Sequence, residues 1–273
     1  GWQAVKTINK LNYRHWHQLH DFQLINPFGT FLLSEKNKLN NLPLSLKAYS
    51  SLSKKIFNQT EMIIAPSRFV LDVHCNNGFF TNQKKEIIPN PIEDQDLEAE
   101  PLNTKTANKF LYIGQLENYK GINTLIKAFL QIDNPNLELR IVGQGSLMQE
   151  CQVYAQKDKR IFIEGWCDGL KVKQLIKNSD VVLYPSECYE NLPTVIIEAQ
   201  TLARPVIASN IGGIKEMITE KDGLLIEAGD ISAWRQAITS FSVGRYNLAD
   251  MSNNALVASK KYSIENYYRL LSN

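Results

Sequence analysis

Two glutamates flank the start of a predicted helix, just after an apolar run that ends at Tyr184. Pro193 suits the first turn of a helix, because its missing backbone N–H needs no partner there. Glu198 then lies inside the helix, and Glu190 lies in the loop before it. An ionised carboxylate accepts hydrogen bonds from two vicinal hydroxyls, so each glutamate is suited to hold a different sugar ring. The alternative is a loop charge and a helix surface charge, since two glutamates at this spacing are common.

Histidines are the residues to consider for a metal ion. His15, His17 and His20 precede Asp21, and the alternation of a strand puts His15 and His17 on one face and His20 on the other. With no fourth ligand evident, we predict no metal site. The cysteines show no C-x-x-C pair, which favours reduced thiols. They are Cys75, Cys151, Cys167 and Cys188.

Glycines follow several of the predicted strands. Gly143 and Gly145 make only part of a dinucleotide fingerprint, so a nicotinamide-dependent dehydrogenase is disfavoured. A tight strand-to-helix turn near a nucleotide base is the preferred interpretation. Gly165 and Trp166 are expected to face the same base, with plain packing as the alternative for Trp166.

Composition favours a soluble globular protein. Of the 273 residues, 44% are hydrophobic and 21% charged, and no apolar run is long enough to span a membrane. Residues 1–91 hold 11 Lys and Arg against 5 Asp and Glu, whereas residues 92–273 hold 19 against 23. This basic front fits anionic lipid or a phosphate-bearing acceptor, and a scattered solvated surface is the alternative. We predict no nucleic-acid partner.

From Phe110 onward, short apolar strands alternate with helical patterns, which predicts a complete doubly wound α/β domain at residues 108–258. Strands are predicted at 110–113, 137–142, 161–163, 181–184, 206–208 and 224–226. Helices are predicted to begin near Gly121, Ser146, Leu170, Pro193 and Gly213, and after Asp230.

Residues 1–92, the front segment, are predicted to form a partial Rossmann-like domain, because they contain too few strands for a free-standing sheet. Strands are predicted at 15–20, 62–65 and 86–88, and helices at 44–57 and 67–75. Residues 93–107 are polar and acidic and are predicted to be the linker. In the last segment, residues 259–273, an amphipathic helix at 263–271 needs an apolar surface to cover.

A family resemblance rests on motifs that occur in order between residue 61 and about residue 230. It is carried by Tyr112–Gly121, Leu139–Gly145, Glu190–Ala199, Pro205–Ser209, Gly212-Gly213 and Asp222–Ile226. Together they resemble the signature of retaining glycosyltransferase family four, the group 1 glycosyl transferases of GT-B fold. The resemblance implies that the chain lacks the beginning of the family's N-terminal acceptor domain.

The resemblance also implies roles for individual residues. Glu190 would contact the transferred sugar and Glu198 the ribose of the nucleotide, while Lys120 would contact the diphosphate. His20, at the end of a front strand, would lie near the donor sugar. Gln115 stands where the family has an arginine on the diphosphate, which removes one positive charge from the leaving-group site.

Backbone groups offer a substitute for that charge. Helix starts at Asn191–Thr194 and at Gly212-Gly213 present unpaired N–H groups to the crevice. Besides Glu198, the expected donor-binding residues are Gly114, Gln115, Gly143, Gly165, Asn191, Leu192, Pro193, Thr194, Gly212 and Gly213. A second departure is Ala203, where the family has a glycine; a left-handed alanine costs about 1 kcal/mol.

The resemblance implies a retaining hexosyltransferase of polysaccharide biosynthesis. The reduced thiols favour a cytoplasmic protein, and the basic front favours peripheral contact at the inner membrane face. It would use a nucleotide-sugar donor and a glycan or lipid-linked glycan acceptor. No side-chain nucleophile, cofactor or metal is expected, because Lys120 and helix dipoles take the role of a divalent ion. Two alternatives remain, which are a catalytically impaired nucleotide-sugar-binding module and one half of a split glycosyltransferase.

Overall fold

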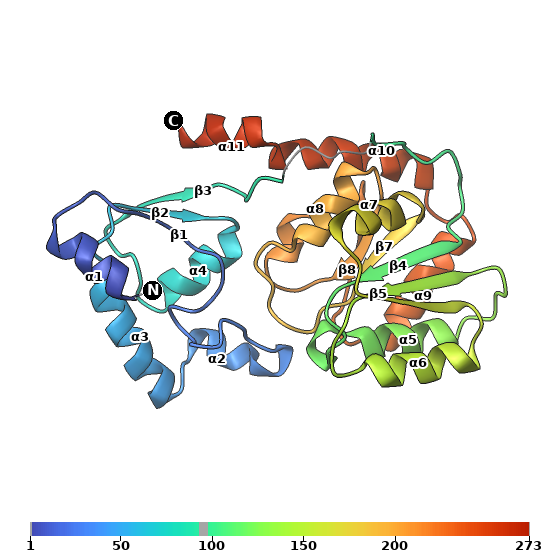
Figure 1. The fold of residues 1–273 in the computed structure, drawn as a ribbon, viewed down its shortest axis with the longest axis horizontal. Coiled ribbons are helices and arrows are strands. Elements are labelled where there is room, and N and C mark those ends of the chain that lie inside the picture. Colours follow the sequence, from blue (N-terminus) through green and yellow to red (C-terminus); the bar gives the residue numbers. More distant parts are fainter. Residues whose placement is uncertain (1, 93–97, 273) are drawn as a thin grey trace.

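The computed structural model describes residues 2–92 and 98–272. They form two α/β lobes, each built on a parallel sheet (Figure 1). We call residues 2–92 the front lobe and residues 98–262 the rear lobe. The front sheet has the order β1-β2-β3, and the rear sheet has the order β6-β5-β4-β7-β8-β9. The predicted α/β class, with a complete rear sheet and a small front one, is confirmed.

The front lobe begins with a helix and alternates short strands with helices. Its elements are α1 (Trp2–Lys10), β1 (Trp16–Gln18), the 3-10 helix η1 (Leu33–Glu35), α2 (Lys36–Asn40), α3 (Leu44–Phe57), β2 (Met62–Ala65), α4 (Arg68–Asn76) and β3 (Lys84–Ile87). Helix α4 begins where predicted, because the Ser67 side chain accepts a hydrogen bond from the Val70 N–H.

The rear lobe repeats the strand–helix unit. Its elements are β4 (Lys109–Ile113), η2 (Asn118–Lys120), α5 (Ile122–Leu130), β5 (Glu138–Val142), α6 (Met148–Lys157), β6 (Ile161–Gly165), α7 (Gly169–Lys177), β7 (Val181–Tyr184), α8 (Thr194–Thr201), β8 (Val206–Ser209), η3 (Gly212–Glu216), β9 (Gly223–Ile226), α9 (Ile231–Ser242), α10 (Leu248–Ser259) and η4 (Lys260–Tyr262). Each predicted rear strand is present.

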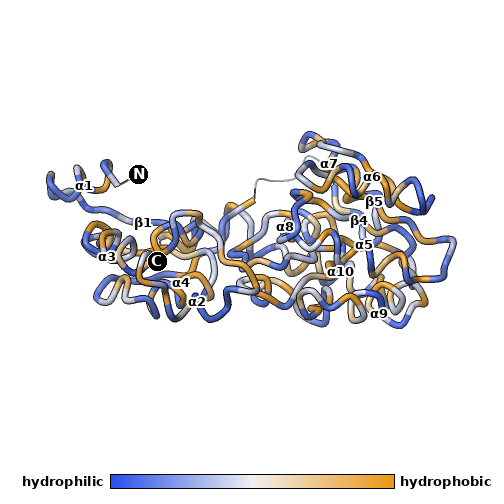
Figure 2. The backbone as a smooth tube through the Cα atoms, turned by 90° about the horizontal axis from the view of Figure 1, so that it is seen from below, coloured by the Kyte–Doolittle hydropathy of each residue, from blue (hydrophilic) through white to orange (hydrophobic). Residues whose placement is uncertain are grey.

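The central strands of the rear sheet are buried on both faces, as expected for a doubly wound fold. Phe110 and Tyr112 pack with α5 and α9 on one face, whereas Leu111 packs with α7 and α8 on the other. Figure 2 shows apolar segments running through the interior of this lobe and polar segments at its periphery. The strand order reverses between β4 and β7, so the loops that follow these two strands diverge and leave a crevice at the carboxyl edge.

Several expectations about elements are wrong in detail. The helix predicted at Gly213 is the five-residue 3-10 helix η3, because its glycines pack against the backbone of a neighbouring loop. The strand predicted at 15–20 pairs with β2 only over Trp16–Gln18. Helices α1, α2 and α10 were not predicted. Helix α2 is short and polar, whereas α1 carries an amphipathic pattern that the sequence analysis missed.

The chain returns to the front lobe at its end. Helix α11 (Ile264–Leu271) lies beyond α10 and over the front sheet (Figure 1). Its apolar residues Tyr267, Leu270 and Leu271 pack with Met62, Ile64 and Ile88. Of the predicted linker at 93–107, residues 93–97 lie outside the described part of the chain. No helix among the described residues is both long and apolar enough to cross a membrane.

Candidate functional site

Two loops of the rear lobe meet at the crevice. One runs from β4 to α5 and the other from β7 to α8. Gly121, with a φ of 71°, lies so close to the second loop that an added Cβ would stand 1.8 Å from the Pro185 carbonyl oxygen. Only glycine allows this approach. Lys120, one residue earlier, is thereby brought to the β7–α8 loop.

Lys120 and Glu190 form an ion pair at this junction. The Lys120 Nζ lies 2.6 Å from the Glu190 Oε1, and their side chains are 20% and 16% exposed. Burial lowers the pKa of Lys120, but the Glu190 charge and hydrogen bond raise it more, so the net pKa lies above its ordinary value. The ammonium therefore stays charged in a largely enclosed site.

Three further donors hold the same carboxylate oxygen. Glu190 Oε1 accepts hydrogen bonds from the Tyr184 hydroxyl at 3.1 Å, the Ser186 hydroxyl at 2.9 Å and the Cys188 thiol at 3.4 Å. Burial and the Glu190 charge raise the pKa of Cys188 to about 11, which keeps the thiol protonated. Among the described residues no hydrogen bond reaches Oε2, so this oxygen can accept hydroxyl donors from a ligand.

A cavity of about 290 Å³ contains this pair and is lined by both lobes. Its front-lobe residues are His20, Asp21, Phe22, Phe28, Gly29 and Thr30. Its rear-lobe residues are Gln115, Tyr119, Lys120, Cys188, Tyr189, Glu190, Asn191, Leu192 and Pro193. The crevice is thus a shared pocket in which a front-lobe ligand would meet a rear-lobe ligand.

A second cavity of about 220 Å³ shares Gln115 and Lys120 with the first. Gly114 and Val195 also line it. Gly143 and Gly165 end the next strands outward: the Gly143 N–H donates to the Gly165 carbonyl, and an added Cβ on Gly143 would stand 1.8 Å from the Gly114 oxygen. These three strand ends therefore lie side by side next to the second cavity.

Gln115 is held by its neighbour. The Tyr119 hydroxyl donates to the Gln115 Oε1 at 2.8 Å, which orients the amide and leaves its N–H groups as donors toward the cavities. The Gln115 amide thus offers hydrogen bonds at the position where the family that this sequence resembles has an arginine.

The loop before α8 is tied to the front lobe. The Asn191 amide donates to the His20 carbonyl at 2.9 Å and its oxygen accepts from the Ser67 hydroxyl at 2.6 Å. Thr194 begins α8 and is exposed. Both the amide N–H and the amide oxygen of Asn191 thus bond to the front lobe.

Gly212 and Gly213 are buried behind this loop and line neither cavity. The Gly213 N–H donates to the Glu190 carbonyl at 2.9 Å. An added Cβ on Gly213 would stand 1.8 Å from the Asn191 carbonyl oxygen. These glycines position the loop that carries Glu190.

Glu198 is half-buried on α8 and lines neither of the two cavities, although Val195, one turn earlier, lines the second. Burial raises the pKa of Glu198, and the charge of Lys173 opposes that rise. The structure therefore joins Lys120 and Glu190 directly and leaves Glu198 one helical turn away from their cavities.

The predicted histidines lie in different environments. His20 is exposed and lines the first cavity, whereas burial, with smaller contributions from neighbouring charges, lowers the pKa of His17 to about 4. Within residues 2–92 and 98–272, no group of three or more His, Cys, Asp or Glu is placed to hold a metal ion.

Trp166 is 69% exposed and lines neither cavity.

Sequence reasoning missed the residues that orient Glu190 and, apart from His20, the front-lobe residues of the cavity. Tyr184, Ser186 and Cys188 alternate along the end of β7 and the following loop, and this alternation of polar side chains was the available signal. Nothing local marked the front-lobe loop, because its place at the cavity depends on how the lobes meet.

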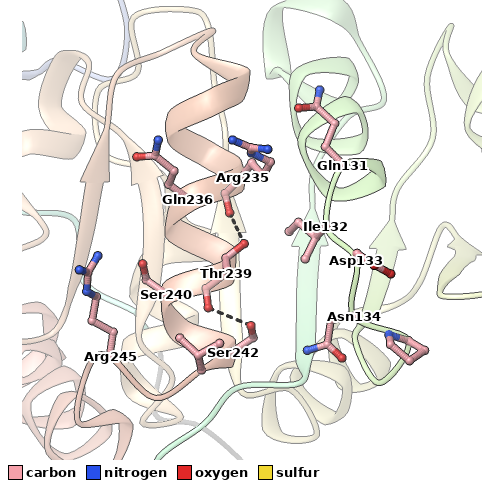
Figure 3. Close-up of a pocket in the computed structure, with 12 residues that line it drawn as sticks. Gln131, Ile132, Asp133, Asn134, Arg235, Gln236, Thr239, Ser240, Ser242 and Arg245 are labelled. Carbon is pink, nitrogen blue, oxygen red and sulfur yellow. Dashed lines mark hydrogen bonds between the residues drawn. The ribbon is translucent and has the colours of Figure 1, made fainter.

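A larger cavity of about 600 Å³ lies elsewhere, between α9 and the segment that follows α5 (Figure 3). Arg235, Thr239, Asn134 and Arg245 are among its lining residues. The α5–β5 connection and the end of α9 lie at the amino edge of the sheet, opposite the crevice. Size alone does not make it the site, because the loops that follow the strands of such sheets carry the ligand.

A family model described as glycosyl transferases group 1 matches residues 93–257, more than half of the chain. An uncharacterized 41.2 kDa protein in the cps region of Klebsiella pneumoniae is 23% identical over 95% of this chain and 74% of its own length. The Escherichia coli UDP-Gal:alpha-D-GlcNAc-diphosphoundecaprenol alpha-1,3-galactosyltransferase is 35% identical, over 47% of this chain and 32% of its own length. The chain thus aligns with about a third of this characterised relative.

Solved structures agree on the fold. Anabaena Alr3699/HepE in complex with UDP has a TM-score of 0.80 and 17% identity, covering 99% of this chain and 74% of that chain. The lipopolysaccharide outer core galactosyltransferase WaaB has a TM-score of 0.73 and 20% identity, covering 99% of this chain and 70% of that chain. The chain has the GT-B fold and belongs to the group 1 glycosyl transferases.

Proposed function

We propose that this chain transfers a hexosyl unit, with retention of configuration, from a nucleoside diphosphate sugar to a glycan or lipid-linked glycan. The observation that carries the proposal is the Lys120–Glu190 pair on the wall of a cavity shared by both lobes. An ammonium suits the departing diphosphate, and a carboxylate with a free oxygen suits sugar hydroxyls.

In the proposed complex, these groups bind the donor. Its diphosphate lies against Lys120 and the Gln115 amide, and a hexose hydroxyl donates to the Glu190 Oε2. Glu198, one helical turn from the second cavity, would hold the ribose. A uridine nucleotide is supported by the HepE complexes with UDP and UDP-glucose and by the UDP-Gal in the name of the Escherichia coli relative.

The acceptor hydroxyl approaches from the front lobe, near His20. The bond between the anomeric carbon and the phosphate oxygen breaks as the bond to the acceptor oxygen forms on the same face. A diphosphate oxygen takes the acceptor proton, so no side-chain nucleophile is needed. Lys120 and the positive N-terminal ends of α5 and α8 stabilise the leaving charge without a metal ion. The basic front lobe would favour a lipid-linked acceptor at an anionic surface.

The experiment measures UDP release from UDP-sugars in the presence of EDTA, together with thermal shift by UDP. Glu190→Gln is expected to lower turnover about 100-fold or more, because the transferred sugar loses its contact with the Glu190 carboxylate. Stabilisation of the variant by UDP should be retained. Glu220→Gln, on an exposed rear-lobe glutamate, is the matched control. Absence of any UDP stabilisation in the wild-type protein would refute the proposal.

The neutral Gln115 at the diphosphate position favours a second candidate, a nucleotide-sugar-binding module. In that case UDP-sugars stabilise the protein but no UDP is released, and Gln115→Arg tightens binding without starting turnover. For the enzyme, Gln115→Arg is expected to raise the rate of UDP release.

A further inference from the structure

A tight turn at residues 26–30 presents one aromatic side chain to the shared cavity. The buried Asn26 holds this turn: its amide donates to the Thr30 carbonyl at 2.7 Å and its oxygen accepts from the Phe28 N–H at 3.1 Å. The Gly29 N–H donates to the Asn26 carbonyl at 2.8 Å, and Gly29 has a φ of 70°. These hydrogen bonds fix the backbone on both sides of Phe28, whose side chain is 87% exposed.

The place of Phe28 separates it from other exposed apolar residues. Leu44, 84% exposed on α3, lines none of the described cavities, and single exposed apolar residues of that kind need no explanation. Phe28 lines the cavity that contains Lys120 and Glu190. Polar residues of the same front-lobe loop, Asp21 and Thr30, line the cavity with it.

We propose that Phe28 is the stacking platform for a pyranose ring of the acceptor, with Asp21 accepting that ring's hydroxyls; this rests on the proposed function. A pyranose has an apolar face of C–H groups and a rim of hydroxyls. The C–H face suits the electron-rich face of an aromatic ring, and the rim suits a carboxylate. The acceptor group at this site is therefore a sugar ring, since an acyclic polyol offers no such face.

The test is saturation-transfer difference NMR in the presence of UDP. The probes are methyl α-glucopyranoside, methyl α-galactopyranoside and methyl N-acetyl-α-glucosaminide, with glycerol as the acyclic comparison. We expect ring C–H protons of at least one pyranoside to receive saturation, and glycerol to receive little. Phe28→Ala should weaken that binding about fivefold or more. Phe28→Tyr should retain it, and Leu44→Ala, equally exposed, should not change it.

Thermal shift by UDP separates this proposal from the donor site. It should be equal in the wild type and in Phe28→Ala. Loss of UDP stabilisation in Phe28→Ala would assign the residue to the donor and overturn the proposal. The proposal would also be overturned if the pyranosides gave no signals, if their signals matched those of glycerol, or if the signals persisted in Phe28→Ala. In each of these cases, UDP binding and Glu190-dependent turnover would still support the proposed function.

Discussion

At the scale of single residues, Lys120 and Glu190 depend on each other. Each is less than a quarter exposed, so each charge loses much of its hydration. The carboxylate has additional support from Tyr184, Ser186 and Cys188, whereas Lys120 has the carboxylate and the ring of Tyr119, 5.7 Å away. Removing the lysine therefore leaves a partly buried negative charge with only neutral donors.

This asymmetry predicts the stability of two variants. Lys120→Met should lower the free energy of unfolding by about 1–3 kcal/mol, because the partly buried Glu190 carboxyl group loses its cationic partner. The double variant Lys120→Met/Glu190→Gln should regain most of that loss, since the amide carries no charge. Urea denaturation of the single and double variants measures both; a double variant no more stable than Lys120→Met would contradict the prediction.

At the scale of elements, α4 shows how the lobes support each other. The Glu216 carboxylate of the rear lobe accepts the backbone N–H groups of Arg68 and Phe69, at 2.8 and 2.7 Å, at the N-terminus of this front-lobe helix. At the other end, His74 is fully buried beside Phe22, Phe79 and Phe80. Its Nδ1 bonds the Val70 carbonyl at 2.7 Å, and its Nε2 has no partner among the described residues.

Acid should destabilise the protein through this helix. Burial lowers the pKa of His74 from 6.5 to about 4. The unfolded chain therefore binds the proton first as the pH falls, and stability is lost from about pH 6.5 down to about pH 4. His74→Leu should reduce this loss. Thermal melts of both proteins across that range are the measurement, and equal pH dependence would show that His74 is not responsible.

At the scale of the whole molecule, contacts on two sides of the crevice hold the lobes together, in addition to the Glu216 contact with α4. The β7–α8 loop contacts the front lobe through Asn191 and through the Tyr189 N–H, which donates to the Phe31 carbonyl. On the other side, α11 leaves the rear lobe and packs on the front sheet. Because α11 directly follows the last rear-lobe element, η4, it links the two lobes at this second place.

Shortening the side chains of α11 tests this role. Tyr267→Ala/Leu270→Ala should destabilise the protein by about 2–3 kcal/mol, because both side chains are half-buried against Met62, Ile64 and Ile88. Tyr268→Ala, on a 64% exposed neighbour, is the control and should cost little. Chemical denaturation distinguishes the two; an equal loss in both variants would mean that α11 does not hold the front sheet.

Much of the fold could be predicted because its signals are local. Apolar strands and helical patterns alternate along the rear lobe, and periodicity reports burial within a few residues of each position. The order of the family motifs likewise predicted the class of protein, confirmed by the family match. Helix α10 was not predicted, since its apolar residues follow only a weak helical periodicity and packing stabilises it.

The sequence by itself determined the rear α/β domain, the family and the position of Glu190 in the loop before α8. Only the tertiary structure decided that Lys120 reaches Glu190, that Glu198 lies a turn away from their cavities, and that Phe28 faces the site from the other lobe. The physical reason is that these relations depend on close backbone approaches and on contacts between distant segments. The approach at Gly121 is one such case, and no local pattern of side chains encodes where two loops will meet.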